Sequence, residues 1–141
     1  MRAVAASLAV ATLLVIACGG GGEVSISDAW VRAAAEGQNS AVYLRIENDG
    51  DADVLLSATA DVARMSSLHQ TTFEGSVVRM EALSTLEIPA ASVIALEPGA
   101  THVMLMVLER ELVPGETVPV QLYFEHAGVI TVDAEVRALG E

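Results

Sequence analysis

Four side chains of this 141-residue chain, His69, Met80, His102 and Met104, carry donor atoms suited to a soft metal ion. Thioether sulfur is a soft, neutral donor that favours copper(I), and imidazole also suits copper. Structural zinc sites prefer thiolate with imidazole, and calcium or magnesium require oxygen ligands. A blue-copper centre needs a Cys thiolate, but the single cysteine, Cys18, ends an apolar leader. The donor types therefore favour copper(I).

The spacing around residues 74–75 predicts a hairpin that brings two of these donors together. If Glu74 and Gly75 form a two-residue turn, His69 and Met80 lie directly opposite each other on the paired strands. Directly opposed residues have Cβ atoms roughly 4.5–5.5 Å apart. One imidazole and one thioether could then reach the same ion.

His102 and Met104 form the second pair, because residues two apart in a strand project to the same face. Whether the two pairs approach each other does not follow from the spacing. Taken singly, each residue also has an ordinary interpretation. The histidines could be half-exposed strand residues, and methionine commonly fills core space. The joint spacing is what argues for a shared site.

That joint spacing, H-x10-M-x21-H-x-M, resembles the signature of the periplasmic copper chaperone family called PCuAC. The resemblance extends over most of the chain after the leader, through 29–33 (AWVRA), 40–48 (SAVYLRIEN), 88–90 (IPA) and 102–106 (HVMLM). It implies a cupredoxin-like fold and an exposed copper(I) site with His69, Met80, His102 and Met104 as ligands. It also implies delivery of copper to respiratory oxidase, chiefly its CuA centre. One departure is Gly99-Ala100-Thr101, where many relatives have consecutive glycines.

The rest of the sequence predicts an all-β domain, an antiparallel β-sandwich or small barrel, in residues 23–141. Short β-rich runs alternate with Gly- and Pro-containing turns about every ten residues, and no segment keeps a helical period. The expected strands are 24–26, 30–33, 41–47, 54–59, 67–72, 76–81, 93–96, 102–108, 118–124 and 129–137.

Residues 1–17 have the pattern of a signal peptide, with Arg2 followed by a fifteen-residue uncharged stretch. Such a helix is too short for a hydrocarbon core of about 30 Å. The stretch ends in Val-Ile-Ala-Cys at 15–18, which resembles a bacterial lipobox and predicts lipidation of Cys18. Residues 18–22 are expected to be the lipid-anchored cysteine followed by a glycine tether at 19–22. The expectation is an exported protein, anchored by lipid on the outer face of the cell membrane or in the periplasm; the alternative is an ordinary signal with an incidental cysteine.

Charge and missing motifs exclude several classes of function. The formal net charge of −12 repels nucleic acid and anionic lipid head groups. No nucleophile elbow, phosphate loop or H-E-x-x-H motif is present in the sequence. Catalytic metals usually keep an open coordination position, whereas four protein ligands would fill a copper(I) shell. We therefore expect neither nucleic-acid binding nor enzyme activity.

The leading interpretation is a copper(I) chaperone whose partner is a copper-accepting protein, such as a cytochrome c oxidase subunit or another chaperone. Copper buffering for tolerance would use the same site. A lipid-tethered interaction module without metal is a further alternative. Met106 continues the face of His102 and Met104 and could be a spare thioether, but core packing is favoured; Met65 could back the site, but core or loop is favoured. His126 is expected in a solvated turn. Trp30 and Arg32 could pack near the rim of the site, but Trp30 is expected to be a structural residue.

Overall fold

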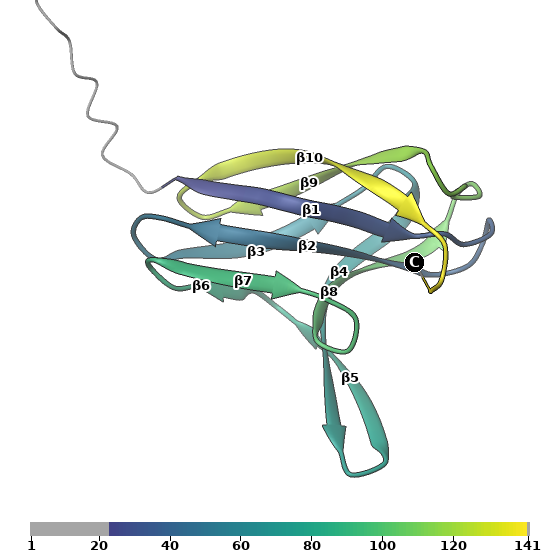
Figure 1. Cartoon of the computed structure of the whole chain (residues 1–141), viewed down its shortest axis with the longest axis horizontal. Coiled ribbons are helices and arrows are strands. Elements are labelled where there is room, and N and C mark those ends of the chain that lie inside the picture. The colour runs from purple at the N-terminus through teal and green to yellow at the C-terminus, as the bar shows by residue number, and fades with distance from the viewer. Residues whose placement is uncertain (1–22, 141) are drawn as a thin grey trace, which may run out of the picture.

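The computed structural model describes residues 23–140, so the predictions for the signal peptide and for Cys18 lie outside the described range. Within that range the chain forms ten strands and no helix (Figure 1), which confirms the all-β prediction. In that part of the chain, then, no helix is long and apolar enough to cross a membrane. The strands are β1 (Val24–Arg32), β2 (Ser40–Asn48), β3 (Asp53–Thr59), β4 (Ala63–Glu74), β5 (Val77–Leu83), β6 (Leu86–Ile88), β7 (Ser92–Leu96), β8 (Thr101–Leu108), β9 (Thr117–Phe124) and β10 (Gly128–Arg137).

The strands form one hydrogen-bonded sheet in the order β5-β4-β8-β2-β1-β10-β9-β3-β6, and β7 also pairs with β2. Every pairing is antiparallel except that of β1 with β10, which is parallel and was not expected. The sheet folds over so that β3 and β4 come together. There the Ser66 hydroxyl of β4 donates to the Ala58 carbonyl of β3 at 2.6 Å. Strands from both ends of the order thus enclose one core.

Alternation along β4 and β8 separates the core from the outer face. Val103 and Leu105 of β8 are fully buried, and Leu68 of β4 is 2% exposed. Burying such a side chain contributes about 1.5–3 kcal/mol. The core cluster of the described chain contains no methionine. The intervening residues of both strands, which include the histidines and methionines, therefore belong to the outer face of the sheet.

The strand pattern differs from the prediction at β1 and β6, and β4 (Ala63–Glu74) is longer than the expected 67–72. The runs expected at 24–26 and 30–33 form the single strand β1, which carries a register shift between Ser27 and Trp30. Asp28 lies in this bulge with a φ of 52°, and aspartate tolerates that left-handed conformation better than most residues. The short strand β6, which pairs with β3, was not expected.

Asp53, at the start of β3, stabilises the turn between β9 and β10 by accepting backbone hydrogen bonds. Its Oδ1 accepts the backbone N–H groups of Val54 at 2.7 Å and His126 at 2.9 Å, and its Oδ2 accepts that of Ala127 at 2.8 Å. Burial acts to raise the pKa of this carboxyl, but the hydrogen bonds outweigh it and the pKa is lowered. The His126 side chain itself is 70% exposed and faces Glu125, as expected of a solvated turn.

Candidate metal centre

Strands β4 and β8 lie side by side and bring three of the four predicted donors to one face. His69 of β4 pairs directly with His102 of β8, and Ser67 pairs with Met104. The two imidazole centroids are 5.9 Å apart, with the ring planes inclined at 52°. The approach of the two predicted pairs, which the sequence left open, therefore occurs through this ladder.

The hairpin of β4 and β5 places the fourth donor differently from the prediction. Met80 pairs with Thr71, and His69 pairs with Ala82, so the direct opposition of His69 and Met80 was wrong. The register is nevertheless displaced by two residues rather than one. His69 and Thr71 share a face, so Met80 still projects to the same side as His69.

The positive φ angle that Gly75 adopts explains the displaced register. The turn consists of Gly75 and Ser76, and Gly75 has a φ of 63°. Two-residue hairpin turns with glycine at their first position suit the twist of the strands. The predicted turn would instead have put Glu74 in that left-handed position, where a side chain is strained.

Met80 is a diagonal neighbour of His69, and such neighbours have Cβ atoms about 7 Å apart, within reach of long side chains. Its side chain is 57% exposed. Thioether side chains have three rotatable bonds and adapt to irregular spaces. Met80 can therefore turn toward the histidines from the edge strand.

The loop before β8 orients His102, which is 3% exposed. Its Nδ1 lies 3.2 Å from the carbonyl oxygen of Ala100, and the backbone N–H of Thr71 donates to the same carbonyl at 3.1 Å. A carbonyl can only accept, so Nδ1 is the donor in this contact and Nε2 is the nitrogen left for a metal ion. This is the arrangement that metal-binding histidines adopt.

His69 has a matching arrangement. Its Nε2 lies 2.8 Å from the Ser67 hydroxyl, and its Nδ1 is buried without a hydrogen-bond partner in the described structure. Burial, and secondarily the electrostatic effect of His102, lowers the pKa of His69 below its ordinary value, which favours the neutral ring that a metal requires. An unpartnered buried nitrogen costs about 1–3 kcal/mol. A metal ion would satisfy it, so the residues fit one.

The thioethers are essential to this donor set. Within residues 23–140, no group of three or more His, Cys, Asp or Glu side chains is placed to hold a metal ion. The two histidines therefore reach more than two donors only with Met104 and Met80. Two imidazoles and two neutral sulfurs would form a donor set that suits copper(I) better than zinc, calcium or magnesium.

Ser67, which the sequence analysis missed, offers a test of the orientation of His69. We expect Ser67→Ala to weaken copper(I) binding by about tenfold, because partners that orient a metal-binding histidine contribute about 10- to 100-fold in affinity. Ser66→Ala is the matched control, since its hydroxyl bonds to Ala58 on the opposite face. Competition with a copper(I) chelator measures the affinity of both variants and of the native protein. An affinity of Ser67→Ala equal to the native one would exclude the role of Ser67.

Aromatic rings support His102 from β2 and β1. The ring of Tyr43 lies 6.2 Å from that of His102, and Trp30 stacks on Tyr43 at 4.6 Å. The guanidinium of Arg137 covers Trp30 at 5.5 Å from the ring centroid. Tyr43 thus contacts both Trp30 and His102, and Trp30 has no ring contact of its own with His102 among the aromatic pairs of the described residues. Tyr43 was not anticipated, although it lies in the 40–48 segment that carries the family resemblance.

Met65 and Met106 have different positions from those expected. They pair across β4 and β8, on the face that carries the histidines. Met65 is 58% exposed and Met106 half-buried, so neither belongs to the core and neither lies in a loop. The error arose because apolar character in a strand was equated with burial.

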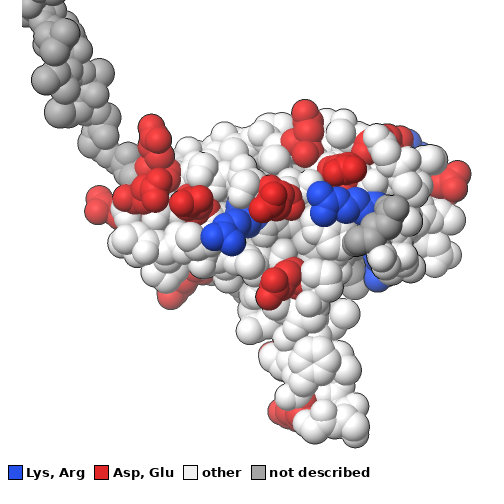
Figure 2. All heavy atoms as spheres, viewed as in Figure 1, with Lys and Arg blue, Asp and Glu red and all other residues white. Residues whose placement is uncertain are grey.

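The hairpin that carries Met80 projects from the body of the domain (Figure 1). Most of its surface is uncharged in the view of Figure 2, whereas acidic side chains are scattered over the body. Phe73 is 62% exposed there, and Val77 and Val78 are more than half exposed. An exposed apolar patch of this kind beside a candidate site is typical of a protein-binding surface.

Comparison with known proteins identifies the family of this chain. Residues 24–136 match the LpqE-like family, described as "Putative lipoprotein LpqE-like", and the chain belongs to this family. The protein named "Putative lipoprotein Lxx21020", from Leifsonia xyli subsp. xyli, is 35% identical over 116 residues, which cover 81% of this chain and 69% of that protein.

Solved structures with the same fold include PCuAC domains. The copper-bound PCuAC domain from PmoF2 superimposes with a TM-score of 0.69 and 26% identity, covering 82% of this chain and 92% of that one. CuI-DR1885 from Deinococcus radiodurans gives a TM-score of 0.63 and 30% identity, covering 82% and 80%. The cupredoxin-like fold implied by the family resemblance is confirmed.

Proposed function

We propose that this chain is an extracytoplasmic copper(I) chaperone that binds one ion through His69, Met80, His102 and Met104. The observation that carries the proposal is the direct pairing of His69 with His102 on β4 and β8, each with one ring nitrogen oriented by a neighbour and the other available. The copper-bound state of a PCuAC domain with the same fold supports it. The role is carriage of the ion rather than catalysis.

Copper(I) is the cargo, and the site supports its release as well as its binding. The thioethers carry no proton to lose, so exchange of a sulfur ligand needs no proton transfer at the site. Met80 lies more than half exposed on the edge strand, where the ligand of an acceptor protein can approach. We propose as acceptor a cytochrome c oxidase subunit bearing the CuA centre, or another copper chaperone.

Export and anchoring complete the proposal. The leader and Cys18 predict a lipid-anchored protein outside the cytoplasm, and membership of a family described as lipoproteins supports it. Methionine suits an oxidising compartment better than a thiol pair, although it can form a sulfoxide. The chain would thus carry copper at the outer face of the membrane or in the periplasm.

The test is a variant that lacks all four donors, with alanine at 69 and 102 and leucine at 80 and 104. We expect the native chain to bind one equivalent of copper(I) in an anaerobic chelator competition, and the variant to bind none while keeping its β-sheet circular dichroism spectrum. Undiminished binding by a folded variant would refute the proposal. It would leave the metal-free interaction module as the better interpretation.

Delivery and buffering need a separate experiment, because both use the same site. Deleting the gene should lower cytochrome c oxidase activity under limiting copper, and restoring the native gene should recover it. Restoring the four-donor variant should not. If the deletion leaves oxidase activity intact and instead increases sensitivity to excess copper, the protein serves tolerance.

A further inference from the structure

All four methionines in residues 23–140 lie on one face of the β5-β4-β8 part of the sheet, and none lies in the core. Met80 and Met104 belong to the proposed four-donor site. Met65 and Met106 remain, paired with each other across β4 and β8. Methionine usually fills gaps in a core, so a pair on the outer face of a sheet needs another explanation.

The pair is too far from the histidines to complete their site. Met65 and Met106 are each four residues along their strands from His69 and His102, a separation of roughly 13 Å at about 3.3 Å per residue. Met104 lies midway, about 7 Å from either end by the same spacing. The pair therefore cannot share an ion held by both histidines.

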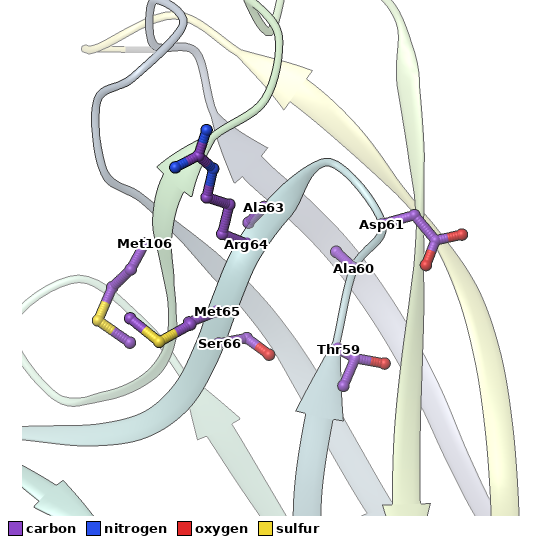
Figure 3. A pocket seen from close by; sticks show the side chains of 8 residues that line it. All are labelled: Thr59, Ala60, Asp61, Ala63, Arg64, Met65, Ser66 and Met106. Atoms are coloured by element: carbon purple, nitrogen blue, oxygen red, sulfur yellow. The ribbon is translucent and has the colours of Figure 1, made fainter.

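The side chains themselves are arranged to face one another. In Figure 3 the thioethers of Met65 and Met106 extend to the same side of β4 and β8 and point toward each other, whereas the ends of Arg64 and Asp61 point away. Met65 and Met106 line an open hollow of about 540 Å³. Arg64 faces Glu109 at 3.8 Å, so its charge is directed away from the sulfurs.

We propose that Met65 and Met106 form a second, weaker binding site for copper(I), next to the four-donor site on which this inference rests. Two converging neutral sulfurs suit a soft monovalent ion and discriminate against zinc, calcium and magnesium. The lack of an imidazole makes the site weaker than its neighbour. Met104, midway between the two, makes the outer face a continuous path of soft donors.

The test is titration of the full chain, purified in detergent, with silver(I), a soft monovalent ion that does not change oxidation state. The methionine methyl groups are followed by carbon-13 NMR. We expect the first equivalent to shift the signals of Met80 and Met104, and the second to shift those of Met65 and Met106. Met65→Leu combined with Met106→Leu should remove the second step and leave the first unchanged.

Leu56→Met is the matched control, because it adds a lone thioether at an exposed position of β3 (44% exposed). Its signal should not move over two equivalents, and a shift as large as that of Met65 would show unspecific thioether binding and overturn the inference. Unmoved Met65 and Met106 signals after a normal first step would overturn it too, leaving the proposed function intact. If no methionine signal responds to the first equivalent, the proposed function fails instead.

Discussion

Replacing His69 by alanine lowers copper(I) affinity by more than about 100-fold, since even the outer partners of metal-binding histidines contribute about 10- to 100-fold. The imidazole supplies one of the two proposed nitrogen donors, and its Nδ1 has no hydrogen-bond partner within residues 23–140. Competition with a chromophoric copper(I) chelator under reducing, anaerobic conditions measures the effect. Met80→Leu, on the edge strand, should cost less than His69→Ala.

His69→Ala should leave the metal-free protein folded. Removing the ring loses some apolar burial but also removes a buried nitrogen that costs about 1–3 kcal/mol while unpartnered. We therefore expect the free energy of unfolding without copper to change by less than about 1 kcal/mol. Gln70→Ala is the control, because Gln70 is exposed on the opposite face of β4. An affinity for His69→Ala within threefold of the native value would remove His69 from the site.

Asp53→Asn lowers the free energy of unfolding by about 1–3 kcal/mol at pH 7, because it leaves a part-buried backbone donor without its charged acceptor. The native Oδ2 accepts the N–H of Ala127 at 2.8 Å, and an amide nitrogen in its place cannot accept. Urea unfolding followed by circular dichroism measures the loss. Asp133→Asn, at an exposed position of β10, should have no effect beyond about 0.5 kcal/mol.

The loss of stability caused by Asp53→Asn should also depend on pH in a defined direction. The folded pKa of Asp53 lies below its ordinary value of 3.8. Its contribution is therefore fully present above that value and is lost as the pH falls through the lower folded pKa. The native protein and Asp53→Asn should approach each other in stability below about pH 4. A difference that stays constant down to the acid limit would mean that the carboxylate charge plays no part.

The sequence predicted the fold class and the sharing of faces because both depend on local periodicity. Residues two apart in a strand share a face whatever the strand pairs with, so His102 and Met104 were placed correctly. The hairpin also kept Met80 on the side of His69, because its true register is displaced by an even number of residues. The residue that pairs with Met80 depends on which two residues form the turn, Glu74-Gly75 as predicted or Gly75-Ser76 as observed.

Pairing between distant strands could not be predicted in the same way. The contact of β4 with β8 joins residues more than thirty positions apart, His69 with His102, and no local signal specifies it. The same pairing brings Met65, which was expected in core or loop, beside Met106 on the outer face, where core packing had been favoured for Met106. Ser67 was the one partner within reach of prediction, since it lies two residues from His69 and thus on its face.

The position of β5 at the end of the sheet has a consequence for the speed of transfer. Among the described strands, β5 pairs only with β4, whereas β4 and β8 are held between neighbours and cover the core. Fraying of an edge strand requires far less free energy than global unfolding, so Met80 can detach while the other three proposed ligands stay fixed. An acceptor's ligand could then replace one sulfur at a time, and the dissociation rate of copper(I) would follow the opening rate of the hairpin. Hydrogen exchange of the β5 amides measures that rate.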